Sequence, residues 1–329
     1  MAIFKADKAV LLAMLEEEYG ADPLPEAANL IIAHDIKVDP AGIEAKRDAL
    51  LSVEGKLPSE MYEGPVKVSF KTHLFCARSF SAAHVLSPLL QAASFVEEVD
   101  IESDCVNYTL TKAADGATPS VCFYFYHGGR FYKALGCCGS LKVNAKAGEL
   151  VELEWEFTGR WAATDVADEA FPSLTGKPTV AHPLRFVGAS EFTLGGIAMA
   201  VANCVIDFGQ KVVGRKDPAA VDGVARYWVE SFEPKTSIDP QAAALSAYNP
   251  FAVAKAKTLG TLTMVVRGIY VERQTSHPHD HRFSITNLQT SWPKPGERDG
   301  LQTYALEATA RAADPATPYV ALFKISNGV

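Results

Sequence analysis

Apolar and polar residues alternate most regularly between residues 139 and 159, on both sides of a short turn. The apolar set is Leu141, Val143 and Ala145 before the turn and Val151, Leu153, Trp155 and Phe157 after it; the polar set is Lys142, Asn144, Lys146, Glu152, Glu154 and Glu156. A period of two predicts a β-hairpin with one buried and one solvated face. Matching apolar with apolar residues places Leu141 opposite Trp155 and Lys142 opposite Glu154. A slip of one residue would set lysine against valine, so the pattern specifies this register.

A similar pattern returns near the C-terminus. Residues 287 to 291 repeat the alternation of residues 140 to 144, and a longer turn of residues 293 to 300 follows. The apolar positions of the returning strand are Tyr304, Leu306 and Ala308, which correspond to Leu153, Trp155 and Phe157. Two related hairpins about half a chain apart indicate two tandem modules of related design.

Residues 1 to 60 are expected to form an N-terminal arm. Val10, Leu11, Met14 and Leu15 have helical spacing and Gly20 is a stop signal, which predicts an amphipathic helix over residues 5 to 19. A short buried strand at residues 30 to 32 and a mixed, turn-rich stretch at residues 40 to 60 follow. Because the arm has little core of its own, we expect it to lie on the body or on a neighbouring chain.

The two modules are predicted at residues 61 to 161 and 185 to 329, separated by a proline-containing linker at residues 162 to 184. The first module has predicted strands at residues 66 to 74, 106 to 111, 121 to 127 and 130 to 135, with Gly128-Gly129 as a two-residue turn, and a helix from Ser87-Pro88 to residue 95. In the second module, strands are predicted within residues 186 to 213, 223 to 232 and 259 to 267, and the dipeptides Asp239-Pro240 and Asn249-Pro250 are taken as helix starts, with a helix at residues 251 to 257. The fold class is therefore β-dominated α+β: two tandem β-sandwich or barrel modules, each with a short helix.

Composition narrows the functional classes. The chain has 329 residues, 48% of them hydrophobic, and a formal net charge of −8, which argues against tight wrapping of nucleic acid. No signal peptide or membrane-spanning run is recognisable. The six cysteines lack CxxC spacing and are interpreted as reduced, small apolar residues.

Candidate chemistry is sparse. His277, His279 and His281 are the only cluster with metal-ligand side chains; Asp280 could orient one of them, although a solvated loop tip between strands is the simpler interpretation. Glu152, Glu154 and Glu156 are typical of a solvated acidic surface rather than of a catalytic site. Residues 173 to 178 lack the residues of a phosphate loop, and no GxSxG elbow occurs. The sequence favours a protein that is not an enzyme and needs no cofactor.

Several segments, in this order and spacing, resemble the major tail (tail tube) proteins of long-tailed bacteriophages. The resemblance covers nearly the whole chain and rests on Glu18-Tyr-Gly-Ala-Asp-Pro-Leu-Pro25 with Asn29, Leu89-Leu-Gln-Ala-Ala-Ser-Phe95, the hairpin of residues 139 to 159, Ser237-Ile-Asp-Pro240 and Pro295-Gly-Glu-Arg-Asp-Gly300. It implies a β-sandwich or barrel module with a flanking helix, stacked as rings into a hollow tube. Two fused modules imply a trimeric ring with pseudo-sixfold symmetry.

The resemblance also implies partners and a location. The partners would be other copies of the chain, the tape-measure protein enclosed by the tube, and the tail terminator and distal tail proteins; DNA would pass without specific binding, and no membrane insertion is expected. The protein would be assembled in the host cytoplasm and reside in the virion tail. Two alternatives remain open: a minor tail or baseplate protein of related fold, and a metal-dependent hydrolase using the histidine cluster.

Two surfaces follow as expectations. Glu152, Glu154 and Glu156 are candidates for lining the lumen, where carboxylates would repel DNA phosphates. The arm and the long turn are expected to contact an adjacent ring or subunit; the turn candidates are Pro293, Lys294, Pro295, Glu297, Arg298 and Asp299.

Overall fold

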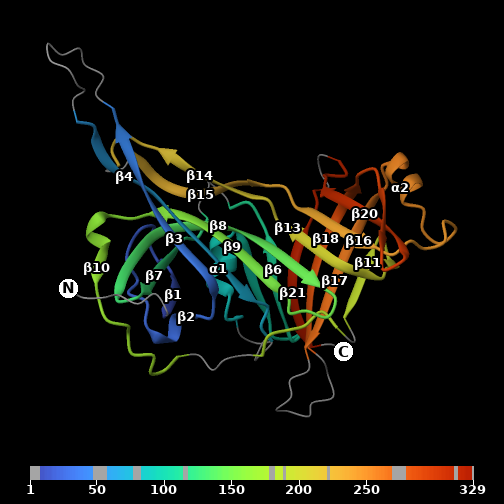
Figure 1. Cartoon of the computed structure of the whole chain (residues 1–329), viewed down its shortest axis with the longest axis horizontal. Helices are drawn as coiled ribbons and strands as arrows, with labels where there is room; N and C mark the ends of the chain where they lie inside the picture. The colour runs from blue at the N-terminus through green and yellow to red at the C-terminus, as the bar shows by residue number, and fades with distance from the viewer. Residues whose placement is uncertain are drawn as a thin grey trace.

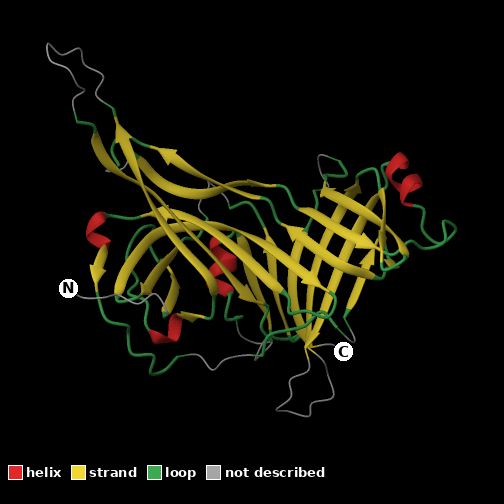
Figure 2. Ribbon diagram, viewed as in Figure 1, coloured by secondary structure: helices red, strands yellow, loops and turns green. Residues whose placement is uncertain are grey.

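Antiparallel strands make up most of the chain in the computed structural model (Figures 1 and 2). The structure describes residues 8–46, 58–76, 83–113, 118–177, 182–187, 190–220, 223–268, 279–314 and 318–327. The helices are α1 (Ser87–Ala92) and α2 (Pro250–Ala256), with 3-10 turns at η1 (Ala27–Asn29) and η3 (Ala163–Asp165). The predicted β-dominated class is confirmed.

The strands of the first half are β1 (Ala9–Leu15), β2 (Leu30–Ile31), β3 (His34–Ala45), β4 (Glu60–His73), β5 (Phe95–Asp100), β6 (Cys105–Leu110), β7 (Val121–His127), β8 (Arg130–Lys146), β9 (Glu152–Arg160) and β10 (Val166–Asp168). Those of the second half are β11 (Glu191–Leu194), β12 (Ile197–Ala198), β13 (Val201–Asp207), β14 (Gln210–Lys216), β15 (Val224–Phe232), β16 (Lys235–Pro240), β17 (Leu259–Gly268), β18 (His279–Thr290), β19 (Lys294–Arg298), β20 (Leu301–Ala310) and β21 (Ala321–Asn327).

One strand order occurs twice in the main sheet. In the first half β3 pairs with β4, β4 with β9, and β9 with β8. In the second half β13 pairs with β16, β16 with β20, and β20 with β18. The two series are joined because β8 also pairs with β13, so one continuous sheet runs through both halves (Figure 1).

The first predicted hairpin has the predicted register. Leu141 lies opposite Trp155, and Lys142 lies opposite Glu154. The apolar face is closed: Trp155 is 2% exposed and donates its indole N–H to the hydroxyl of Thr72 at 3.0 Å. Gly139 is required here, since an added Cβ would lie 2.3 Å from the ring of Phe157.

The second hairpin differs from the prediction. Leu288 lies opposite Ala310, four residues beyond the position of Leu306 that the alignment implied. The expected long turn is wrong, because Lys294–Arg298 form strand β19, which pairs with β20. The reversal occurs at Asp299 and Gly300, whose φ angles of 53° and 76° suit a two-residue hairpin turn.

The predicted N-terminal helix is also wrong, because residues 9 to 15 form β1. This strand pairs with β7 along its whole length and with β2 on its other edge. Leu11 and Leu12 are each 1% exposed, so both faces of the strand are covered. A strand buried on both faces has a continuous run of apolar residues. Such a run also contains apolar residues at helical spacing, so periodicity alone does not separate the two structures.

Residues 34 to 45 form β3, although residues 40 to 60 were expected to be turn-rich. Pro40 lies within this strand. A proline is tolerated there because β3 pairs only with β4 among the described strands, which makes it an edge strand. The predicted Gly128-Gly129 turn is confirmed, with φ angles of 60° and 89° between β7 and β8.

The two helices predicted within the modules are present, and the capping of α1 differs from the expectation. Asn249 caps α2 by accepting a hydrogen bond from the backbone N–H of Ala252 at 3.0 Å, as expected. Asp239-Pro240 was wrongly taken as a helix start, because it ends strand β16. In α1 the N-cap position belongs to Leu86, and the Ser87 hydroxyl instead donates to the carboxylate of Glu97.

The core is continuous across the halves. Phe70, Phe123, Trp155 and Phe157 pack together in the first half, with the rings of Phe123 and Phe157 5.0 Å apart. Strand β6 pairs with β21 from the C-terminal end, and Tyr108 stacks on Phe323 at 5.8 Å. All six cysteines are buried, which fits their interpretation as small apolar residues.

Candidate assembly surface

The three glutamates predicted to line a lumen lie on one solvent-facing side of the sheet. Glu152, Glu154 and Glu156 alternate along β9 with the buried Leu153, Trp155 and Phe157. Strands β4 and β8 flank β9 and present lysines on the same side. The structure therefore brings these glutamates together with cations rather than leaving them as an isolated acidic row.

Lysines neutralise each of the three carboxylates. Lys71 lies 2.8 Å from Glu152 and 3.1 Å from Glu154. Lys142 lies 3.6 Å from the other oxygen of Glu154, and Lys67 lies 3.5 Å from Glu156. His34 on β3 adds a contact of 3.1 Å to Glu152.

These contacts shift the titration of two groups. Hydrogen bonds to Glu152 and Glu154 raise the pKa of Lys71 above its usual value. Partial burial acts to raise the pKa of Glu152, but hydrogen bonds from Lys71 and His34 outweigh it, so this pKa lies below its usual value. Both side chains are therefore charged at neutral pH, and neither is a general acid or base there.

A groove of about 650 Å³ lies over this part of the sheet. Its polar lining includes Lys71, Lys142, Glu154, Glu156 and Asp207, from strands of both halves of the chain. Paired charges of both signs form a hydrated surface rather than a pocket for an apolar ligand. The geometry suits contact with a charged, mobile or water-covered partner.

Polar residues of the same types occupy equivalent positions in the two halves of the sheet. Lys67 lies opposite Thr158, and Lys235 lies opposite Thr309. The other equivalent pairs across the strands are Asp39 with Lys67 and Asp207 with Lys235, and Ser69 with Glu156 and Ser237 with Glu307. A polar pattern of Asp, Lys, Ser, Glu and Thr on three adjacent strands therefore occurs twice in one continuous face.

The repeat is also visible in the sequence, in the polar residues rather than in the hydrophobic pattern. Residues 156 to 160 read Glu-Phe-Thr-Gly-Arg and residues 307 to 311 read Glu-Ala-Thr-Ala-Arg. Likewise, Lys67-Val-Ser69 corresponds to Lys235-Thr-Ser237. Polar residues on the solvated face, rather than the apolar ones, preserve the correspondence.

The predicted contact residues of the long turn lie on β19 and its reversal. Pro293 is buried, whereas Lys294, Pro295, Glu297 and Asp299 are exposed. Arg298 is tied to the sheet, because it lies 2.6 Å from the carboxylate of Asp239. Asp239 also accepts hydrogen bonds from the backbone N–H groups of Ala202 and Asn203.

His279 and His281 lie in strand β18 rather than in the expected solvated loop tip. His277 lies outside the described residues, and only the backbone of His279 is described, opposite Asn327 in the sheet. His281 in β18 is 0% exposed and packs beside the ring of Phe323 in β21. Within the described ranges, no group of three or more His, Cys, Asp or Glu residues could hold a metal ion.

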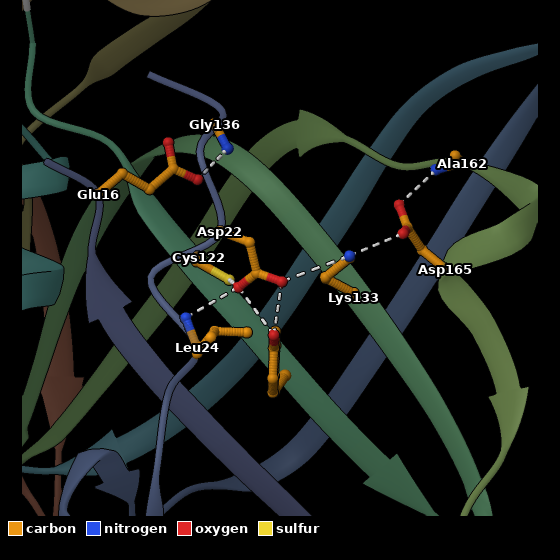
Figure 3. A network of polar contacts seen from close by, with 9 residues as sticks. Glu16, Asp22, Leu24, Cys122, Lys133, Gly136, Ala162 and Asp165 are labelled. Carbon is orange, nitrogen blue, oxygen red and sulfur yellow. Dashed lines mark hydrogen bonds and ion pairs between the residues drawn. The ribbon is translucent and has the colours of Figure 1, made fainter. Parts of the chain in front are cut away.

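A second polar cluster fixes the loop after β1 (Figure 3). The carboxylate of Asp22 accepts hydrogen bonds from the hydroxyl of Tyr124 at 2.6 and 2.8 Å and from the backbone N–H of Leu24. Lys133 bridges Asp22 at 3.4 Å and Asp165 at 3.0 Å. The hydrophobic pattern gives no signal for this cluster, although Asp22-Pro23 is a recognisable turn signal.

The titration of this cluster indicates a structural role. Partial burial acts to raise the pKa of Asp22, but hydrogen bonds from Tyr124 and Leu24 and the charge of Lys133 outweigh it, so this pKa is lowered. Burial, together with Asp22, raises the pKa of Tyr124 above its usual value. The carboxylate stays ionised and the phenol stays protonated over the physiological range, so the pair holds the loop rather than exchanging protons.

Scans of the sequence against protein-family models and curated proteins found no match. No helix among the described residues is long and apolar enough to cross a membrane.

Proposed function

We propose that the chain is the building block of a bacteriophage tail tube, in which stacked rings enclose the tape-measure protein and conduct DNA. The sequence resemblance suggests this role. The observation that carries it is the repeated strand order, β3-β4-β9-β8 followed by β13-β16-β20-β18, within one continuous sheet. One chain then contributes two tandem modules of related design.

The internal repeat supports a ring of three chains. Each chain would present the polar pattern twice, once around Lys67 and once around Lys235. Three chains related by a threefold axis would present it six times, which gives pseudo-sixfold symmetry. A closed ring would also cover the sheet edges that a single copy leaves open.

The continuous polar face is the surface we assign to the lumen. This face of the sheet is solvated, and the opposite face packs on the buried core. Glu152, Glu154 and Glu156 lie near the centre of the polar face. Because lysines pair with these carboxylates, repulsion of DNA would be milder than a bare acidic row would produce. Neutralised, hydrated side chains would still leave few unpaired cations for DNA phosphates to bind.

Electron microscopy of the purified protein, combined with quantification of the chain in virions, tests the proposal. We expect rings or tubes in micrographs and many copies per particle. A few copies per particle would favour a minor tail or baseplate protein. A chain that stays monomeric at high concentration and is absent from virions would contradict the proposal.

A further inference from the structure

We infer that β3 of one copy of the chain pairs with β19 of a second copy, in the way that β13 pairs with β8 within the chain. The inference rests on the proposed ring and names the lateral contact that would close it. The partner is therefore a second copy, and the surfaces are two strand edges at opposite ends of the repeated sheet.

Strand β3 is equivalent to β13. Each is the first strand of its series, and Asp39 and Asp207 each lie opposite the lysine of the repeated pattern. The two strands also share an irregularity. The pairing of β3 with β4 shifts register a few residues before Asp39, and the pairing of β13 with β16 shifts register a few residues before Asp207. The difference is in their neighbours: β13 has β8 on its second edge, whereas the second edge of β3 has no partner among the described strands.

Strand β19 is equivalent to the C-terminal part of β8. Lys142 lies opposite Glu154, two residues before Glu156, and Lys294 lies opposite Ala305, two residues before Glu307. Residues 142 to 146 of β8 pair with β13 on the other edge. In the described part of the chain, β19 pairs with β20 alone, so the corresponding edge is open.

Charge complements this pairing. In the junction within the chain, Lys142 lies opposite Asp207. The equivalent residues at the two open edges are Lys294 and Asp39, both exposed. Opposite charges directly across two strands stabilise the pair, whereas pairing two β3 edges or two β19 edges would lose this match.

Each open edge also carries a proline, which would oppose indiscriminate strand pairing. Pro40 lies on β3 and Pro295 on β19, and neither has an N–H to donate. In the chain's own junction the backbone N–H of Phe208 donates to the carbonyl of Leu141 at 3.2 Å, and Phe208 corresponds to Pro40. The contact between copies would therefore have a shorter hydrogen-bond ladder than the junction inside the chain, and prolines at edges oppose nonspecific strand addition.

Disulfide capture tests the contact. Residues directly opposite each other on antiparallel strands have Cβ atoms about 4.5–5.5 Å apart, close enough for an introduced pair to bridge after a small adjustment. The test variant carries Asp39→Cys and Lys294→Cys, and the matched control carries Lys142→Cys and Asp207→Cys. The native cysteines are buried, so background oxidation should be low.

After mild oxidation of assembled protein, we expect the test variant to form covalent dimers and trimers on denaturing gels. The control should form a disulfide within one chain and migrate as a monomer. A mixture of the two single variants, Asp39→Cys and Lys294→Cys, should give dimers containing one of each, which mass spectrometry of the linked peptides would identify.

The outcomes separate the inference from the proposed function. Rings or tubes that give no link between residues 39 and 294, while the control oxidises, would overturn the inference and leave the tube proposal standing. Dimers linked through two copies of residue 39 would also overturn it, because they require a symmetric edge contact. A test variant and an unmodified chain that both remain monomeric at high concentration would overturn the inference and the proposed function together.

Discussion

The hydroxyl of Tyr19 accepts a 2.7 Å hydrogen bond from the backbone N–H of Tyr227. This contact joins the loop after β1 to strand β15, which comes from the other half of the sequence. The guanidinium of Arg226 lies 4.8 Å from the centre of the Tyr19 ring, and Gly136 makes room for that ring, since an added Cβ would lie 2.6 Å from it. Burial raises the pKa of Tyr19 well above its usual value, so the hydroxyl stays protonated.

Replacing Tyr19 with phenylalanine should therefore destabilise the fold by about 1–3 kcal/mol, because the N–H of Tyr227 loses its acceptor. Urea denaturation followed by tryptophan fluorescence measures the change. Tyr62→Phe is the control, since Tyr62 is 54% exposed and should shift the free energy of unfolding far less. Equal effects of the two substitutions would show that the Tyr19 contact does not stabilise the protein.

Gly139→Ala should destabilise the protein by about 1–3 kcal/mol or more, because the added methyl group overlaps the buried ring of Phe157. Gly260→Ala on β17 is the matched control, since the atoms nearest its Cβ position lie 3.6 Å away. Thermal unfolding compares the two variants. Similar melting temperatures for both would contradict the tight approach of β8 and β9 at Gly139.

Removing the positive charge of Lys71 by substitution with methionine should raise the pKa of Glu152 toward its usual value, because Lys71 helps to keep that carboxyl ionised. NMR titration of the Glu152 carboxyl carbon measures this directly. Lys67→Met should leave Glu152 unchanged, since Lys67 contacts Glu156 instead. An unchanged Glu152 titration in Lys71→Met would mean that the ion pair is not formed in solution.

Asp22→Asn should destabilise the protein at neutral pH and less so in acid. The folded-state pKa of Asp22 is lowered, so its contribution is present above the unfolded-state pKa of about 3.9 and is lost as pH falls through the folded value. Denaturation at a series of pH values gives the difference between the two proteins. In a Tyr124→Phe background the difference should shrink; a difference independent of pH would contradict a stabilising carboxylate.

The sequence was sufficient where one face of a strand is buried and the other solvated. The pairing of Leu141 with Trp155 could be predicted because alternation fixes both the buried face and the register. Alternation gives no such signal for Leu11 and Leu12 in β1, because this strand is buried on both faces and has no period of two. It follows that deleting residues 1 to 60 would remove β1 and β3 from the sheets and should unfold the protein.

The candidate surface was only partly predictable. The face occupied by Glu152, Glu154 and Glu156 followed from alternation, but their lysine partners on β4 come from a distant segment, and pairing between β4 and β9 had no local signal. The turn at residues 293 to 300 was misassigned because Pro295 and Gly296 suggest a loop, although a sheet edge tolerates a proline. The core position of His281 depends on β21, which lies far along the chain.

The central claim is that copies of this chain assemble in threes around an axis, each contributing two equivalent halves of one sheet. Native mass spectrometry of rings released from purified assemblies measures the number of chains directly. The account predicts a mass three times that of the 35.4 kDa chain, with end-on images that show six similar lobes. A ring of six chains, or a stable monomer at high concentration, would contradict it.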